Sequence, residues 1–420
     1  MGSSGLASWQ ARLGGGALLL AALLVLSACA PRQVSNGHLV VIGGSLQPHN
    51  TEVYERLVML SDEGTVGVLP TASGSPEESG RAEAARLNLH LGEDRAAVID
   101  VPGGDPEAAD SDVVAEAIGQ HSGVYFTGGD QARVTAAFLP EGRETRGLRA
   151  LRELLERDGF IAGTSAGAAI LSDPMIVDGT SRDALAHGIR READTAEGVR
   201  IAPGIGFLDQ GLTDQHIFTR GRLGRLIVAQ QETRTPFGFG VDDNRAFHLD
   251  LNTGVLEALG GPHGVVFVDL SRSTHSRGGH YGIRLSVLSS GDRLIAESGE
   301  VIPAVDKVRL RQPHGDPEEL VAEDAWARNA IRDLIVELAF QPVRTALALD
   351  ESFELRFIED DWTRFWTSRE GEPDSLTVVN LRLDIVPRLD GDVADADGCS
   401  SPLSGSEDGA PYRETGRSAG

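Results

Sequence analysis

The chain has 420 residues, of which 40% are hydrophobic and 24% charged, so it can bury one large core or two modest ones. This composition argues against a disordered or fibrous protein. The formal net charge of −25 at pH 7 repels phosphate backbones and argues against nucleic acid as a partner. Lys307 is the only lysine, so catalysis by a lysine Schiff base or a Ser/Lys dyad has almost no candidate.

Residues 1–29 have the pattern of a lipoprotein signal peptide. A thin basic region at Arg12 precedes an apolar run at 17–26, which is too short to span a bilayer. The sequence Leu-Ser-Ala-Cys follows at 26–29 and resembles the bacterial lipobox, in which the cysteine is lipidated. We therefore expect an exported protein that is lipid-anchored through Cys29 to the bacterial cell envelope, and Ala30 favours the outer membrane. The alternative is an ordinary cleaved signal peptide and a secreted protein.

After a polar linker at 30–37, short apolar runs alternate with longer segments that suit helices. We predict strands at 39–42, 66–69, 97–101, 123–126 and 160–162, and helices at 79–91, 109–119, 131–138 and 148–157. Most of the runs are bounded by Gly, Pro, Ser or Thr, which is typical of buried parallel strands with connecting helices. The pattern predicts an α/β protein with a doubly wound, mostly parallel sheet.

The sequence of the second half of the chain predicts mostly strands. Apolar runs at 237–241, 246–249, 255–259 and 265–268 are expected to extend or cover the sheet. We therefore assign a catalytic domain to residues 38–300. Residues 301–388 form a C-terminal extension whose role the sequence leaves open, with a helix at 326–340 and a strand at 376–386. The acidic tail at 389–420 contains almost nothing apolar and is expected to be disordered.

Residues 160–171 have the pattern of a strand, a Gly-x-Ser-x-Gly turn around Ser165 and a helix start. This is the context of a nucleophile elbow, although the same residues also suit a plain strand-to-helix turn. A serine nucleophile needs N–H groups that bind the oxyanion. Ala166 is the candidate for the first, and Gly128 or Gly129, of which we assign Gly129, for the second. A glycine loop made only for turning is the alternative there.

A serine nucleophile also needs a base and an acid. His216 is the candidate base because it closes the polar triplet Asp-Gln-His on the C-terminal side of Ser165, although a lone histidine is more often structural. Asp242 and Asp243 follow a predicted strand and are candidate acids, or else turn residues. The order Ser, His, acid differs from that of α/β-hydrolases, so the elbow does not imply their fold.

Several blocks of sequence together resemble the cyanophycinase family of serine exopeptidases, which is related to dipeptidase E. They lie in the family's order at 123–131, 161–169, 173–179, 204–208 and 214–226. The resemblance implies a fold similar to class I glutamine amidotransferases, with Ser165 as nucleophile and His216 as base. It assigns the acid to Asp243, where the family has a glutamate. A second departure lies at 43–47, where the family carries an acidic residue after a glycine pair.

The resemblance also implies a substrate and the residues that bind it. The substrate is cyanophycin, a polyaspartate whose side chains carry arginine through isopeptide links, cut through an acyl-enzyme into β-Asp-Arg dipeptides. The implied binding residues are Gln131, Asp214, Gln215, Arg220 and Arg225. Asp214 is expected to face a substrate guanidinium, and Arg220 or Arg225 a substrate carboxylate.

Two other functions stay open. One is an isoaspartyl or aspartyl dipeptidase; the other is a tethered polymer-binding lipoprotein in which Asp243 fails to orient His216. We expect no cofactor or metal, because His263, His275 and His280 lack a carboxylate at ligand spacing. The oligomeric state is also open, with a homodimer among the alternatives.

Overall fold

The computed structural model describes residues 36–190, 197–313, 315 and 319–388. The expected signal peptide with its lipidation site Cys29 and the acidic tail at 389–420 lie outside these residues. Among the helices of the described residues, none has the length and apolar character needed to cross a membrane.

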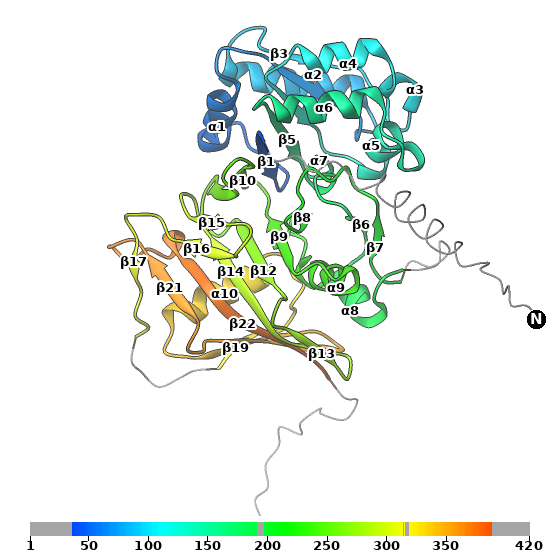
Figure 1. Cartoon of the computed structure of the whole chain (residues 1–420). Helices are drawn as coiled ribbons and strands as arrows, with labels where there is room; N and C mark the ends of the chain where they lie inside the picture. The colour runs from blue at the N-terminus through cyan, green and yellow to red at the C-terminus, as the bar shows by residue number, and fades with distance from the viewer. Residues whose placement is uncertain (1–35, 191–196, 314, 316–318, 389–420) are drawn as a thin grey trace, which may run out of the picture. The chain divides into compact units, whose positions relative to one another are not determined.

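One sheet has the strand order β16-β15-β11-β10-β1-β5-β4-β2-β3 (Figure 1). Its parallel part consists of β1 (His38–Ile42), β5 (Phe160–Thr164), β4 (Gly123–Phe126), β2 (Val66–Leu69) and β3 (Ala96–Val98). Its antiparallel part consists of β10 (Ala246–Asp250), β11 (Val255–Leu259), β15 (Arg293–Ile295) and β16 (Glu300–Ile302). The predicted strands at 246–249 and 255–259 thus extend this sheet, as expected.

Helices cover both faces of the parallel part. Because side chains alternate along a strand, β1 sends Val40 and Ile42 to one face and Leu39 and Val41 to the other. The first face packs against α1 (Thr51–Ser61) and α2 (Pro76–Leu91). The second packs against α4 (Asp112–Gly119), α5 (Gln131–Phe138) and α6 (Arg146–Glu156). This arrangement confirms the predicted doubly wound α/β class.

Local signals explain where the observed helices depart from the predicted ranges. Pro76 occupies the first turn of α2, so that helix starts before residue 79. The helix expected at 109–119 is broken into α3 (Pro106–Ala109) and α4, because the Ser111 side chain accepts a hydrogen bond from Val114 N and caps α4. Asn329, with φ +63, precedes α10 (Ala330–Phe340), which therefore starts later than residue 326.

A second, mostly antiparallel sheet has the order β18-β19-β20-β22-β14-β12-β9-β8. Its strands are β18 (Leu320–Ala322), β19 (Thr345–Leu349), β20 (Phe353–Ile358), β22 (Thr377–Pro387), β14 (Gly279–Leu288), β12 (Val265–Asp269), β9 (Phe237–Val241) and β8 (Leu212–Gln215). Short strands β13 (Thr274–Ser276), β17 (Val308–Arg309) and β21 (Arg364–Thr367) join it at the side. Strands on both sides of residue 300 therefore share this sheet.

Helices α9 (Leu223–Thr233) and α10 contribute to the apolar core of the second sheet. The remaining elements are α7 (Ala166–Ala169), α8 (Ser181–His187), the antiparallel pair β6 (Met175–Asp178) and β7 (Arg200–Ala202), and two short 3-10 helices, η1 (Pro140–Gly142) and η2 (Pro373–Ser375). Figure 1 shows the parallel part of the first sheet and its helices in blue to green and the C-terminal strands in yellow to orange.

The carboxyl ends of strands from both sheets are joined by the loop after β1. His216 N, after β8, donates to Gly43 O at 3.1 Å, and Asn244 N, after β9, donates to Gly44 O at 2.7 Å. Ser165 N, after β5, donates to Ile42 O at 3.0 Å. Ligand sites in α/β proteins form at the carboxyl ends of parallel strands, so this junction is where a site is expected.

Candidate active site

Ser165 lies on a sharp turn between β5 and α7. Its backbone has φ +53 and ψ −111, which a residue other than glycine adopts at a cost of about 1–3 kcal/mol. The flanking glycines are required: a Cβ on Gly163 would lie 2.1 Å from Gly167 O, and one on Gly167 would lie 2.5 Å from Phe126 O. The structure thus has the elbow geometry predicted from the Gly-x-Ser-x-Gly pattern.

The structure brings Ser165, His216 and Asp243 into one hydrogen-bonded chain. Ser165 Oγ lies 2.8 Å from His216 Nε2, and His216 Nδ1 is hydrogen-bonded to Asp243 Oδ1. The partners assign the tautomer: Nδ1–H donates to the carboxylate, and Nε2 accepts from the serine hydroxyl. His216 is buried, whereas Ser165 and Asp243 are partly exposed. This arrangement has the geometry of a serine nucleophile, a base and an orienting acid.

The two neighbouring aspartates have different partners. Asp242 Oδ1 accepts hydrogen bonds from Phe218 N at 3.2 Å and Thr219 N at 2.8 Å, in the loop that follows His216. Asp243 faces the imidazole. The geometry therefore favours Asp243 as the acid, and Asp242 fixes the loop that carries His216.

The surroundings of Asp243 favour its charged form. Burial by itself would raise the pKa of Asp243, but hydrogen bonds from His216 and Ser45 and the positive charges of His216 and Arg220 lower it below its usual value. Asp243 is thus ionised at neutral pH and can stabilise an imidazolium on His216. Ser45 lies in the loop at 43–47, which the sequence comparison with the family marks only as a departure from the family pattern.

Gly44 provides the surface against which the His216 ring packs. A Cβ on Gly44 would lie 2.2 Å from His216 Cε1 and 2.8 Å from Nε2, and its φ is +126. Only glycine fits a position that combines this φ with so close an approach. The loop after β1 therefore positions the base as well as joining the two sheets.

The expected oxyanion donors lie around the elbow. In the described part of the chain, the N–H groups of Ala166 and Gly129 have no hydrogen-bond acceptor. Gly129, with φ +146, packs against Ala72 O, whereas Gly128 is the glycine beside the nucleophile. A Cβ on Gly128 would lie 3.4 Å from Ser165 Cβ. The assignment of these donors stays a prediction.

Asp214 and Arg225 are paired with each other, so neither presents a free charge here, and their expected role in binding substrate charges stays a prediction. Arg225 Nε donates to Asp214 Oδ2 and Arg225 Nη2 to Asp214 Oδ1, both at 2.7 Å. Their side chains are 1% and 2% exposed, respectively. A buried bidentate pair satisfies both charges internally. The pair fixes α9 to β8 behind the site.

The other predicted binding residues divide into two buried amides and one exposed arginine. Gln131 Nε2 donates to Ile176 O and Val177 O, both at 2.8 Å, so it supports β6. Gln215 is also buried, and its Oε1 accepts from Arg222. Arg220 is exposed and close enough to Asp243 to affect its pKa. Of the five predicted binding residues, Arg220 is thus the exposed one, and the binding roles of all five stay predictions.

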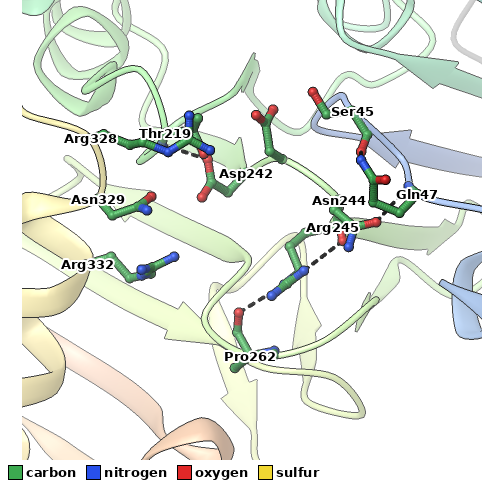
Figure 2. A pocket seen from close by; sticks show the side chains of 11 residues that line it. Ser45, Gln47, Thr219, Asp242, Asn244, Arg245, Pro262, Arg328, Asn329 and Arg332 are labelled. Atoms are coloured by element: carbon green, nitrogen blue, oxygen red, sulfur yellow. Dashed lines mark hydrogen bonds between the residues drawn. The ribbon is translucent and has the colours of Figure 1, made fainter. Parts of the chain in front are cut away.

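The sequence shows Arg222 in the run of three arginines after His216 but gives it no role of its own, and it does not indicate the neighbouring pocket. Burial lowers the pKa of Arg222 to about 10, with repulsion from Arg225 and Arg220 acting in the same direction against attraction by Asp214. Its place between the two predicted arginines was the signal for it. Beside Asp243 lies a pocket of about 440 Å³ (Figure 2). The C-terminal extension contributes Arg328 and Arg332 to this pocket, and neither belongs to a recognisable sequence motif.

The chain is similar to several known proteins. A sequence model of peptidase family S51 matches residues 39–252, a segment that contains the whole hydrogen-bonded chain. A cyanophycinase of Trichormus variabilis (strain ATCC 29413 / PCC 7937) is 28% identical over 293 residues, which cover 66% of this chain and 91% of the relative. A cyanophycinase of Synechococcus elongatus is 30% identical over 240 residues, covering 55% and 69%, respectively. The crystal structure of a peptidase from an acI-B1 Actinobacterium is similar with a TM-score of 0.43 at 17% identity, covering 57% of this chain and 92% of that one.

Proposed function

Because the chain belongs to peptidase family S51, we propose that it is a serine exopeptidase that hydrolyses cyanophycin to β-Asp-Arg dipeptides. The observation that carries the proposal is the hydrogen-bonded chain from Ser165 through His216 to Asp243. The relatives that are named cyanophycinase, of which this chain covers 69–91%, support the substrate class.

The proposed reaction proceeds through an acyl-enzyme. Ser165 Oγ attacks the scissile carbonyl carbon while His216 Nε2 takes the hydroxyl proton, and Asp243 stabilises the resulting imidazolium. The N–H groups of Ala166 and of Gly128 or Gly129 bind the oxyanion of the tetrahedral intermediate. His216 then gives its proton to the leaving amine, and water, activated by the same base, hydrolyses the ester on Ser165.

The substrate that we propose carries a positive and a negative charge on every repeating unit. Each isopeptide-linked arginine has a guanidinium and a free α-carboxylate, so the polymer is not repelled by a chain of net charge −25 as a polyanion would be. Arg220, exposed beside Asp243, is placed to bind one of these carboxylates bidentately.

The test incubates the chain from Pro31 onward with purified cyanophycin and detects released dipeptides by mass spectrometry. We expect β-Asp-Arg from the parent protein and none from the Ser165→Ala variant. Hydrolysis of small isoaspartyl dipeptides without polymer cleavage would replace the proposal with the dipeptidase alternative. If neither substrate is cleaved and a serine-reactive inhibitor leaves Ser165 unlabelled, the non-catalytic binding protein is the better account.

We further propose that the protein is exported and lipid-anchored through Cys29. The support is the lipobox-like sequence at 26–29 behind a short apolar run. Expression in a bacterium fed labelled palmitate should label the membrane-bound protein, and Cys29→Ser should remove both the label and the membrane association. Cys399→Ser, which changes the only other cysteine, is the matched control and should keep both. An unlabelled parent protein in the medium would support the secreted alternative instead.

A further inference from the structure

The pocket beside Asp243 is built by segments that are far apart in the sequence. Figure 2 shows two sets of side chains that face each other across it. One set comes from the C-terminal extension: Arg328, Asn329 and Arg332. The other comes from the loops that carry the candidate site: Ser45, Gln47, Asp242, Asn244 and Arg245. The extension thus contributes side chains to a cavity that borders the acid of the catalytic chain.

The extension is attached directly to the loop that carries the base. Asn329 N donates to Phe218 O at 3.0 Å, two residues after His216. Gly221, in the same loop, lies so close to Trp326 that a Cβ on the glycine would be 2.5 Å from Trp326 O. These contacts fix the backbone that carries Arg328 relative to the candidate site.

The cations of the pocket are poorly compensated. Arg245 donates to Pro262 O at 3.1 Å and to Asn244 O at 2.9 Å; within the described residues it makes no ion pair, and Asp242, Asp374 and Glu52 attract it only from a greater distance. Arg328 is exposed and, over the same residues, makes no ion pair. Arg332 pairs with its exposed neighbour Asp333 at 2.8 Å, which is a weak, solvent-screened interaction.

The acidic groups of the pocket are already engaged. Asp242 Oδ1 accepts from two backbone N–H groups, and Asp243 is bound to His216. Burial lowers the pKa of Arg245, and repulsion from Arg332 acts in the same direction against attraction by Asp242, Asp374 and Glu52. The lining holds three arginines against two aspartates, so the pocket offers a surplus of positive charge to a ligand, in a chain whose net charge is −25.

We infer that this pocket is a carboxylate-binding subsite, in which Arg328 and Arg332 bind the free α-carboxylate of an isopeptide-linked arginine next to the residue held at Ser165. The inference rests on the proposed function, because it takes that polymer as the substrate. The pocket borders Asp243, which is hydrogen-bonded to His216, and His216 Nε2 lies 2.8 Å from Ser165 Oγ, so the polymer has to extend past the imidazole ring to place a neighbouring residue there. Guanidinium groups bind carboxylates bidentately, which makes arginine suited to this role. Both arginines lie outside residues 39–252, so the subsite is an addition to the family's segment.

The experiment measures binding to the Ser165→Ala protein by calorimetry, so that the ligand stays intact. The probes are an oligomer of three β-Asp-Arg units and the same oligomer with each arginine α-carboxylate converted to a carboxamide. We expect the carboxylate form to bind about tenfold more tightly, the effect of losing a charge-assisted hydrogen bond. The double variant Arg328→Gln/Arg332→Gln should lose most of this preference, and what remains is the contribution of Arg220. The matched control Arg344→Gln changes an exposed arginine of the extension that does not line the pocket, and it should keep the tenfold preference.

Kinetics of the active enzyme separate this inference from the proposed function. Arg328→Gln/Arg332→Gln should raise KM for the carboxylate oligomer about tenfold and leave kcat nearly unchanged, as expected for lost uniform binding. If the parent enzyme is active and the double variant has the same KM and the same probe preference as the parent, the subsite is overturned and the proposed function stands. A parent enzyme that cleaves no oligomer, while the Ser165→Ala protein still prefers the carboxylate probe through these arginines, would overturn the proposed function alone. If Arg344→Gln also lost the preference for the carboxylate probe, the preference would depend on the overall charge of the protein and not on this pocket, and the subsite would be overturned.

Discussion

At the scale of single residues, the candidate site is held in backbone conformations that are rare elsewhere. The residues other than glycine with positive φ in its loops are Ser45 (φ +50), Ser165 (φ +53), His216 (φ +55) and Asn244 (φ +58). Each such conformation costs energy and persists only where its surroundings enforce it. Hydrogen bonds to the loop after β1 do so here, since Gly43 O binds His216 N and Gly44 O binds Asn244 N.

Gly44→Ala should disable the site without unfolding the protein. The new Cβ would overlap His216 Cε1, so the ring must move away from Ser165. A displacement of about 1 Å can cost about 100-fold in rate, and we expect a loss of at least that size in kcat/KM. Gly104→Ala is the matched control, because Gly104 also has positive φ (+75) but no atom within 4 Å of the new Cβ. Equal activities of the two variants would show that Gly44 does not position the base.

Asp243→Asn should lower kcat by about 10³–10⁴-fold, because an amide neither favours the correct His216 tautomer nor stabilises its imidazolium. Steady-state kinetics on the oligomer measure this loss. Asp242→Asn is the control: its side-chain carbonyl can still accept from Phe218 N and Thr219 N, so most activity should remain. The reverse result, with Asp242→Asn inactive and Asp243→Asn active, would move the role of the acid to Asp242.

At the scale of elements, buried ion pairs connect segments that are separate along the chain. The Asp214–Arg225 pair joins β8 to α9, and Lys307 Nζ, with a side chain only 4% exposed, binds both carboxylate oxygens of Asp292 before β15. Removing one partner of such a pair leaves a buried charge unpaired. These residues therefore stabilise the arrangement of elements that the site requires.

Arg225→Met should destabilise the protein by about 3–5 kcal/mol, because Asp214 would be left charged and buried. Denaturant unfolding measures the change, and the double variant Asp214→Leu/Arg225→Met should recover much of it. Arg220→Met, which removes an exposed arginine, should change stability by less than about 0.5 kcal/mol but raise KM. If Arg225→Met instead raised KM at unchanged stability, the substrate-binding role implied by the family resemblance would be supported.

At the scale of the whole molecule, the C-terminal extension is part of the same cooperative structure as the candidate site. Strand β22 lies between β14 and β20, so residues 279–288 pair with residues of the extension. The apolar core of the second sheet contains both Ile227 of α9 and Ile335 of α10. The extension thus completes a sheet whose other end carries His216 and Asp243.

A chain that ends at residue 304 should therefore fail to fold. The cut removes β22 and α10 and exposes the apolar face of β12 and β14, which favours aggregation. A chain that ends at Arg388 keeps both elements and is the control, expected to unfold cooperatively by circular dichroism and to stay active. A soluble, active protein ending at residue 304 would show that the first sheet and β8–β9 suffice.

Acid should weaken the second sheet through His280. Burial, with the nearby His275, lowers the pKa of His280 from 6.5 to about 4. The unfolded chain thus binds a proton more readily, so this contribution to stability is present above about pH 6.5 and is lost as the pH falls toward 4. Between pH 7 and 5 the loss is about 2 kcal/mol.

His280→Phe keeps the ring and should remove that part of the pH dependence when unfolding free energies are compared at the two pH values. The exposed His275→Phe is the control and should retain most of it. An identical pH dependence in His280→Phe and the parent protein would contradict the assignment.

The sequence by itself determined the features that depend on near neighbours along the chain. Apolar runs such as 123–126 and 237–241 became strands at those residues, and the pattern around Ser165 became an elbow. These features follow from side-chain alternation, glycine flexibility and capping, which act over a few residues. The blocks of sequence that resemble the family also predicted Ser165 as nucleophile, His216 as base and Asp243 as acid.

Only the tertiary structure decided which charged groups meet. Asp214 and Arg225 are both charged residues, and the residues next to them in the sequence do not show whether they form a buried ion pair or bind substrate. The same holds for the pocket, where Ser45 of the first loop lies opposite Arg328 of the extension. The strands at 237–241 and 265–268 entered the second sheet for the same reason, because strand pairing is set by long-range packing. Burial and charge pairing depend on contacts between distant segments, and these exist only once both sheets have formed.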